Sequence, residues 1–172
     1  MELLKRLSEA AGVPSREEEI REIIKQALTG QVDELTVDRL GNLIARKKGQ
    51  GPKVAVAAHM DEIGFLVSHV DEEKGFLRIE PVGGFDPRTL VAKRVTVHTG
   101  SGPLVGLIGT KPVHILTEEE KKKELKISDL FVDLGLPGDR VKELVRVGDP
   151  VTLRQDFVEV GELVSGKALD DR

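Results

Sequence analysis

The sequence predicts an α/β fold in which a layer of helices and strands is interrupted by a β-rich, barrel-like insert. Near the N-terminus, apolar residues recur at the spacing of amphipathic helices. A short apolar run at residues 54–58 follows the breakers Gly51 and Pro52, which is typical of a buried strand. From Ile63 onward, short apolar runs alternate with glycine-rich turns, which favours a small barrel or sandwich.

Composition narrows the class of protein. The 172 residues suffice for one domain or two small ones, and 39% hydrophobic with 33% charged residues predicts a core beneath a charged surface. A net charge of -4 with both signs interspersed argues against a nucleic-acid partner. No apolar run reaches the roughly 18 residues of a membrane span, and the N-terminus lacks the apolar core of a signal peptide, so we expect a cytoplasmic protein. The absence of cysteine excludes thiolate metal sites, and the scarcity of Asn with many Lys, Arg and Glu resembles a thermophile composition.

The first 62 residues are expected to form the helices and first strands of the α/β layer. Leucines at helical spacing predict a helix over residues 2–11. Ser15 and Glu18 match a capping box, so a second helix should begin at Ser15 and end before Gly30. The strands expected here are residues 32–37, 43–46 and 54–58.

The next hundred residues are expected to be mostly strands. Thr117 begins a capping box, which predicts a helix over residues 117–124. Pro137 is suited to the start of a helix and predicts another over residues 137–144. Residues 151–154 and 157–160 should pair as a last hairpin. The other strands expected are residues 63–70, 76–81, 94–99, 104–108 and 130–134.

Polar side chains follow the expected strand at residues 54–58. In open α/β sheets, functional residues gather beyond the carboxyl ends of the strands. A neutral imidazole suits a transition metal, so His59 is a candidate metal ligand. A carboxylate two residues later can hold the other ring nitrogen, so Asp61 is a candidate orienting residue. On its own, a His-x-Asp triplet is equally typical of a polar turn.

Two acidic residues, Asp170 and Asp171, stand just before the last residue, Arg172. Without further information, a solvated and frayed terminus is the simplest interpretation of this pair. The other histidines, His69, His98 and His114, fall in the β-rich insert and are expected to be structural or exposed.

Five motifs follow one another along the chain. They are AHMDEIG at 58–64, GGFDPR at 83–88, IGTKPVH at 108–114, VGDPV at 147–151 and GKALDDR at 166–172. In this order they resemble the TET-type (glutamyl) di-metal aminopeptidases of the zinc-peptidase clan. The resemblance covers essentially the whole chain, and five ordered motifs make it specific.

The resemblance implies a domain organisation. Residues 1–62 would be the N-terminal part of a zinc-peptidase-like α/β catalytic layer, and residues 63–164 a β-rich, barrel-like dimerisation domain. Residues 165–172 would be a truncated return to the catalytic domain. The partners implied are a peptide substrate and further copies of the chain, as a dimer or a larger homo-oligomer.

The resemblance also assigns roles to three side chains. His59 resembles the terminal ligand of one metal, Asp61 the carboxylate that orients it, and Asp170 the aspartate that bridges two metals. The cofactors implied are two divalent ions, zinc or cobalt, about 3.5–4 Å apart.

The family's general-base Glu and three of its five metal ligands lie after the motif at which this sequence stops. We therefore expect the 172-residue chain alone to bind metal weakly or not at all and to be inactive. The alternative is a non-catalytic oligomerisation or assembly module of the same fold. A glycoside hydrolase would need paired carboxylates and is disfavoured by the absence of Trp and Tyr. A peptide-binding module on the β-rich insert remains open.

Overall fold

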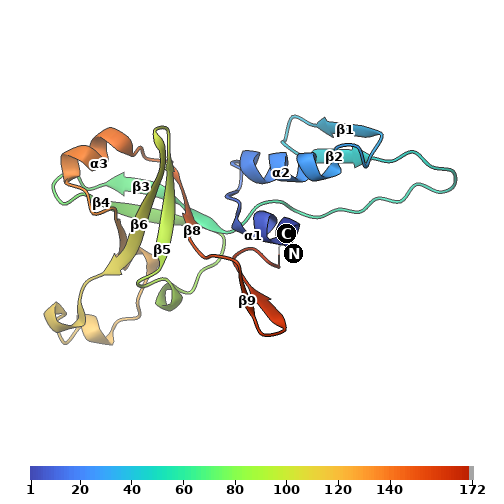
Figure 1. The fold of residues 1–172 in the computed structure, drawn as a ribbon. Helices are drawn as coiled ribbons and strands as arrows, with labels where there is room; N and C mark the ends of the chain where they lie inside the picture. The colour runs from blue at the N-terminus through green and yellow to red at the C-terminus, as the bar shows by residue number, and fades with distance from the viewer. Residues whose placement is uncertain (171–172) are drawn as a thin grey trace. The chain divides into compact units, whose positions relative to one another are not determined.

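The fold comes from a computed structural model that describes residues 1–170 (Figure 1). The chain divides into two compact units. The barrel unit is Ile63–Arg154, and the terminal unit combines Met1–Glu62 with Gln155–Arg172. The predicted α/β class with a β-rich, barrel-like insert is confirmed.

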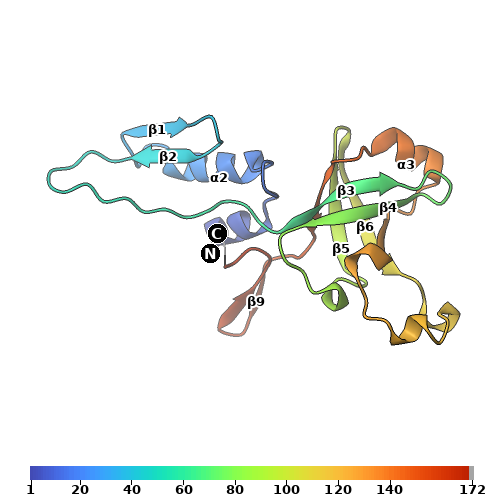
Figure 2. The same ribbon diagram turned by 180° about the vertical axis from the view of Figure 1, so that it is seen from behind.

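Six antiparallel strands close the barrel unit, in the order β3-β4-β7-β6-β5-β8. Figures 1 and 2 show these strands from opposite sides. The strand that enters the barrel, β3, pairs with the strand that leaves it, β8, through Phe65 opposite Val151. The strands are β3 (Gly64–Val70), β4 (Phe76–Val82), β5 (Arg94–Thr99), β6 (Gly102–Thr110), β7 (Leu130–Asp133) and β8 (Pro150–Leu153).

Alternate side chains along the strands fill the barrel. Phe65 and Val67 on β3 and Leu77 and Ile79 on β4 are buried, as the two-residue period of a strand requires when one face is inside. The short helix α3 (Gly138–Leu144) adds Val141 to the same core. Because closure pairs every strand on both sides, the barrel has no open sheet edge.

The long connection between β6 and β7 contains only 3₁₀ turns, so the helix expected over residues 117–124 is wrong. The capping-box contacts do form: the Thr117 amide donates to Glu120 Oε2 at 2.7 Å, and the Glu120 amide donates to Thr117 Oγ1 at 3.2 Å. A helix does not continue because the segment is charged throughout and offers no apolar face to bury. The 3₁₀ turns of the barrel unit are Pro87–Thr89, Val113–Ile115, Glu120–Lys122 and Ile127–Asp129.

The terminal unit holds two helices and two separate hairpins. Its core is small, with Val13, Ile20 and Phe157 as its largest buried apolar residues. Gly161, with a φ of 63°, opens the two-residue turn of the second hairpin, where a positive φ suits glycine. The elements are α1 (Glu2–Glu9), α2 (Glu18–Leu28), β1 (Glu34–Val37), β2 (Leu43–Arg46), β9 (Val158–Val160) and β10 (Leu163–Ser165).

The strand expected at residues 54–58 is absent from the structure. The segment has no regular secondary structure, and Val54 and Val56 are 84% and 95% exposed. Strands form only when their backbone groups find a partner, and within residues 1–170 no strand pairs with this segment. The prediction of a buried strand at residues 54–58 is therefore wrong in both pairing and burial.

Two smaller expectations also need correction. Residues 151–154 and 157–160 do not pair with each other, because β8 closes the barrel between β3 and β5 while β9 pairs with β10. Ser15 does not cap α2: its φ is 67°, and its own amide donates to Glu17 Oε1 at 2.6 Å. The residue that precedes the helix is Glu17, which makes no side-chain capping bond.

The outer boundary of the insert was expected at residue 164, whereas the compact barrel unit ends at Arg154. The domain division of the complete protein stays a prediction.

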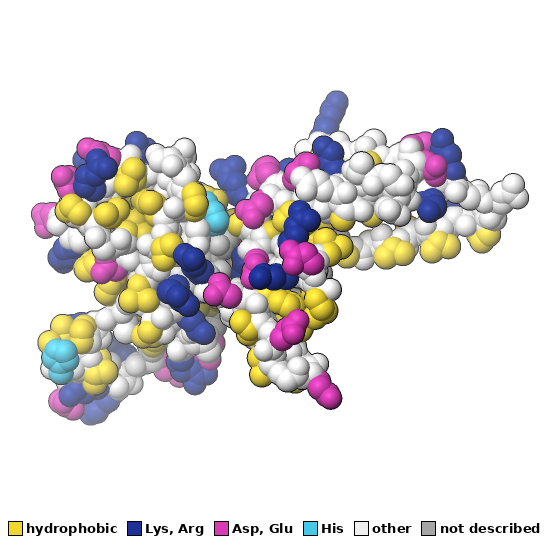
Figure 3. Space-filling view, in the orientation of Figure 1, with side chains coloured by type: hydrophobic (Ala, Val, Ile, Leu, Met, Phe, Trp, Pro, Cys, Tyr) yellow, Lys and Arg dark blue, Asp and Glu magenta, His cyan; other side chains and the backbone are white. Residues whose placement is uncertain are grey.

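On the face drawn in Figure 3, acidic and basic side chains are interspersed, and the basic side chains do not gather in a single patch. No helix within residues 1–170 is both long and apolar enough to cross a membrane.

Candidate functional site

His59 and Asp61 contact each other directly, as their spacing predicts. His59 Nδ1 lies 2.8 Å from Asp61 Oδ1, and both side chains are more than one-third exposed. A proton on Nδ1 satisfies the carboxylate and leaves Nε2 as the ring nitrogen that can bind a metal. The extended segment thus presents an oriented imidazole at an accessible position, and the metal role of the pair stays a prediction.

Asp170 is the third predicted site residue and the last one described. It is exposed and lies in a turn, two residues after Ala168, whose φ is 54°. The structure does not bring Asp170 into hydrogen-bond contact with His59 within residues 1–170. Asp171 lies outside the described residues.

The donor set fits only part of a metal centre. One imidazole and one carboxylate are suitable ligands for zinc or cobalt, but stable zinc sites use three or four protein ligands. Among residues 1–170, no group of three or more His, Asp or Glu side chains is arranged to hold a metal ion. The described residues alone therefore do not form a complete metal centre.

Sequence reasoning missed the ion pair between Glu62 and Lys167. Lys167 Nζ lies 2.7 Å from Glu62 Oε1, and the two side chains are only 8% and 4% exposed respectively. The pair joins residues 105 positions apart in the sequence, and no local pattern links them. The available signal was that each belongs to a motif with a site residue: Glu62 follows Asp61, and Lys167 precedes Asp170.

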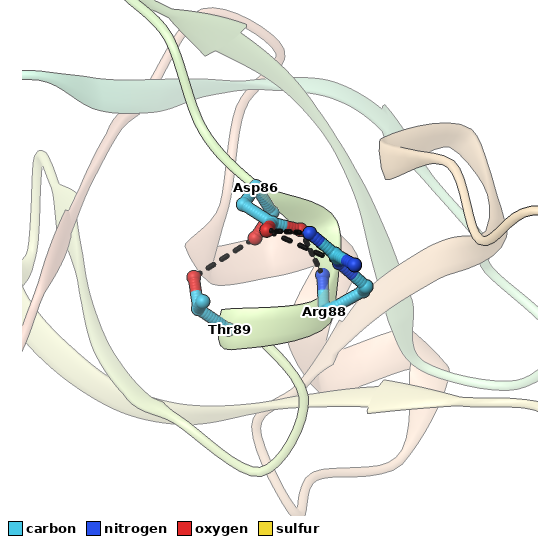
Figure 4. Close-up of polar contacts among 3 residues, drawn as sticks. All are labelled: Asp86, Arg88 and Thr89. Atoms are coloured by element: carbon cyan, nitrogen blue, oxygen red, sulfur yellow. Dashed lines mark hydrogen bonds and ion pairs between the residues drawn. The ribbon is translucent and has the colours of Figure 1, made fainter.

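The GGFDPR motif at residues 83–88 forms a locked turn in the barrel unit (Figure 4). Asp86 Oδ1 accepts from the Arg88 amide at 3.0 Å, and Asp86 Oδ2 accepts from Arg88 Nη2 at 2.6 Å. Thr89 Oγ1 donates to the Asp86 carbonyl at 2.8 Å. The side-chain hydrogen bond from Arg88 lowers the pKa of Asp86, and the same contact raises the pKa of Arg88. These contacts stabilise the turn, and the Asp86 carboxylate is used in binding Arg88.

The remaining histidines lie in the barrel unit. His98 Nε2 is 2.9 Å from Thr152 Oγ1, in a partly buried contact between β5 and β8. His69 on β3 and His114 in a 3₁₀ turn are exposed. Their positions agree with structural or surface roles.

Comparison with known proteins gives one family. Residues 41–172 match the model of the family described as M42 glutamyl aminopeptidase. The FrvX protein of Escherichia coli (strain K12) is 42% identical over 176 residues, which cover 100% of this chain and 49% of that protein.

Solved structures agree with the fold. The TET1 peptidase of Pyrococcus horikoshii superimposes with a TM-score of 0.87 at 36% identity, over 99% of this chain and 52% of that one. A Thermotoga maritima structure described as an endoglucanase superimposes with a TM-score of 0.81 at 38% identity, over 98% of this chain and 50% of that one.

The chain spans about half the length of the relatives it matches. The family model nevertheless covers most of the sequence, and all of the chain aligns with a relative at 42% identity. The chain therefore belongs to the M42 glutamyl aminopeptidase family.

Proposed function

We propose that the chain contributes His59, Asp61 and Asp170 to the site of a metal-dependent, cytoplasmic aminopeptidase that removes N-terminal residues from peptides. The observation that carries the proposal is the 2.8 Å contact between His59 Nδ1 and Asp61 Oδ1, the kind of contact by which a carboxylate orients a metal-binding imidazole. Membership of the M42 glutamyl aminopeptidase family supports the same reaction. The activity is proposed for the whole protein, since the relatives are about twice as long.

Each of the three side chains has its own task in this proposal. When bound, two divalent ions, zinc or cobalt, supply an activated water and a positive charge for the developing oxyanion. His59 would hold one ion through Nε2, while Asp61 keeps the proton on Nδ1 and fixes the ring plane. Asp170 would bridge the two ions. Residues outside this half would add the remaining ligands and the general base.

Substitutions in the complete protein test these assignments. His59→Ala should remove a ligand and abolish tight binding of one ion, with a loss of kcat/KM. Asp61→Asn should weaken metal binding by about 10–100-fold, the usual effect of removing a carboxylate that orients a ligating histidine. His69→Ala, which removes an exposed imidazole of the barrel unit, is the matched control and should change neither quantity. A His59→Ala protein with full metal content and wild-type turnover would refute the assignment.

We also propose that the 172-residue chain is inactive by itself. Water attack on a peptide needs a proton acceptor within hydrogen-bond reach, and none of the five matching motifs supplies the family's general-base Glu. The purified chain should not hydrolyse aminoacyl chromogenic substrates with zinc or cobalt added. Turnover comparable to that of an ordinary peptidase would contradict this expectation.

Self-association through the barrel unit completes the proposal. Val105 and Leu107 on β6 are exposed apolar residues, and apolar surface of this kind often marks an interface. The similar TET1 peptidase of Pyrococcus horikoshii is described as assembling into a tetrahedron or a large octahedral shell. Light scattering after size exclusion should give a dimer or a larger species, and Leu107→Glu should reduce its mass. Leu40→Glu, in the exposed β1–β2 turn, is the control, and a monodisperse wild-type monomer would overturn the idea.

A non-catalytic assembly module is the second candidate. It is favoured by the lack of a three-ligand metal cluster within residues 1–170. Elemental analysis of the complete protein separates the two: two tightly bound ions per chain support the peptidase, and none supports the module. Glycoside hydrolysis is not proposed despite the similar endoglucanase structure, because His59 and Asp61 are not a carboxylate pair and the chain lacks Trp and Tyr.

A further inference from the structure

The terminal unit contains one buried cluster of polar groups that the proposed reaction leaves unexplained. Its centre is the ion pair between Glu62 Oε1 and Lys167 Nζ, at 2.7 Å. Lys167 Nζ also donates to the Ala10 carbonyl at 3.2 Å, and the Gly12 amide donates to Glu62 Oε1 at 3.2 Å. The short segment that follows α1 therefore contacts both charged side chains.

Two further hydrogen bonds hold the same three segments together. The Glu62 amide donates to the Gly12 carbonyl at 2.8 Å, and Ser8 Oγ donates to the Lys167 carbonyl at 2.5 Å. A Cβ at Gly166 would lie 2.6 Å from Ser8 Oγ, so only glycine lets the chain approach this closely. The segment of Glu62 and the segment of Lys167 thus both form hydrogen bonds with residues 8–12.

Stability alone is a weak reason for such a pair. Two charges lose their hydration on burial, and a well-packed apolar pair of the same size is often as stable or more so. A buried ion pair does fix geometry, because both partners must meet at hydrogen-bond distance or remain uncompensated. The cluster therefore specifies where its two segments lie.

Those two segments carry the candidate metal ligands. His59 lies three residues before Glu62, and Asp170 lies three residues after Lys167. Three residues span at most about 10 Å, so each candidate ligand lies close to its end of the ion pair. A shift at the pair would be passed on to His59 on one side and to Asp170 on the other.

We propose that the buried Glu62–Lys167 pair is a positioning element that fixes the segment of His59 and Asp61 relative to the segment of Asp170. It thereby sets the spacing of the metal ligands, and in this respect it rests on the proposed function. Neither Glu62 nor Lys167 binds the metal or the substrate. Their effect is transmitted through the backbone that each one anchors.

Paramagnetic Mn²⁺, titrated into the 172-residue chain and followed by NMR, tests the proposal. In the wild-type chain, the resonances of the His59 ring and of Asp170 should broaden with one shared midpoint. Lys167→Met and Glu62→Gln should each raise the midpoint by about 10–100-fold, the usual cost of losing a group that orients a ligand, and should separate the two residues' midpoints. The control pair is Lys142 with Glu72, an exposed ion pair of the barrel unit at 2.6 Å, and Lys142→Met should leave the titration unchanged.

The double variant Glu62→Gln/Lys167→Met separates positioning from stability. With both charges removed, thermal unfolding should return toward that of the wild-type chain, because no charge remains buried without a partner. The Mn²⁺ midpoints should stay separated, because the anchor is still missing. A double variant that regains both the wild-type unfolding temperature and the shared midpoint would show a purely structural role. Single variants with the wild-type midpoint would overturn the proposal as well.

Hydrogen exchange tests the anchoring role of the Glu62–Lys167 pair in the absence of metal. The amides of Gly12 and Glu62 form hydrogen bonds inside the cluster, so Lys167→Met should speed their exchange at least about tenfold. Unchanged exchange at both amides would contradict the anchoring role. A wild-type chain in which neither His59 nor Asp170 responds to Mn²⁺ would agree with the weak binding expected of this half alone, and the exchange result would then decide on the pair.

Discussion

The barrel unit and the terminal unit differ in how completely their strands are paired. In the barrel unit, six strands pair on both sides around a core that includes Phe65, Leu77 and Ile108. In the terminal unit, two hairpins form separate sheets, and residues 54–58 have no strand partner within residues 1–170. The difference teaches that an apolar run becomes a buried strand only where the chain also supplies the strands that pair with it.

Hydrogen exchange should give the largest contrast between the units. The Ile108 amide donates to the Lys93 carbonyl at 2.9 Å inside a closed sheet, and Ile108 is fully buried. Val56 is 95% exposed, and its amide has no backbone partner within residues 1–170. Core amides exchange through global opening, so Ile108 should exchange at least about a thousandfold more slowly than Val56. Comparable protection at the two amides would break the comparison.

Truncating a leucine in each unit sharpens the contrast. Leu77 is fully buried in the barrel core, whereas Leu40 is 88% exposed in the β1–β2 turn. Leu77→Ala should lower the free energy of unfolding by about 2–5 kcal/mol, since it removes buried methyl groups and leaves a cavity. Leu40→Ala, the same chemical change at the surface, should stay within about 0.5 kcal/mol. Urea unfolding measured by circular dichroism checks both, and equal effects would contradict the packing assigned to the barrel.

Two glycines of the barrel unit test how tightly it is packed. A Cβ at Gly138 would lie 1.9 Å from the Glu72 carbonyl oxygen, whereas a Cβ at Gly84 would meet no atom within 4 Å. Gly138→Ala should therefore cost about 1–3 kcal/mol through overpacking against backbone. Gly84→Ala should be neutral or stabilise by up to about 1 kcal/mol, because alanine restricts the unfolded chain. Thermal unfolding of the two variants would show the difference, and a neutral Gly138→Ala would argue against the close approach.

The smallest expected effect is a change in the pKa of Glu120, which lies in the charged connection between β6 and β7. Lys111 and the Thr117 amide hold the Glu120 carboxylate and lower its pKa to about 2. Because the pKa is lower in the folded chain, the resulting stability is fully present above pH 4.5 and is lost as the pH falls toward 2. Lys111→Gln should raise the pKa of Glu120, as followed by carboxylate NMR. Lys121→Gln is the control, since Lys121 pairs with Glu118 at 2.7 Å, and an equal shift there would contradict the assigned cause.

The sequence predicted most elements of the barrel unit because each carries its own local signal. Alternating apolar residues and flanking turns marked β3, β4 and β5 to within one residue at either end. The capping box at Thr117 predicted the correct hydrogen bonds but not their consequence, because a cap does not supply an apolar face. The pairing of β8 was missed because its partners lie far away in the sequence.

The candidate site divides in the same way. His59 and Asp61 are two residues apart, so their contact follows from spacing and side-chain chemistry. Glu62 and Lys167 are 105 residues apart, and their only sequence signal is that each lies in a motif with a candidate site residue. The prediction of a buried strand at residues 54–58 was wrong because burial depends on neighbouring segments, which the apolar run itself does not determine.

The pairing of β3 with β8 has a consequence for chain entropy. Since Phe65 lies opposite Val151, the folded barrel holds its own entry and exit side by side. The folded barrel therefore connects the two flanking segments as a short loop would. An unfolded barrel is a long loop between them, and the free-energy cost of closing a loop rises by about 0.6 kcal/mol for each doubling of its length. The meeting of Glu62 with Lys167 thus becomes an almost local event once the barrel has closed. Barrel formation should come first, and the insert should be replaceable by a tight turn without changing the distance that the terminal segments must bridge.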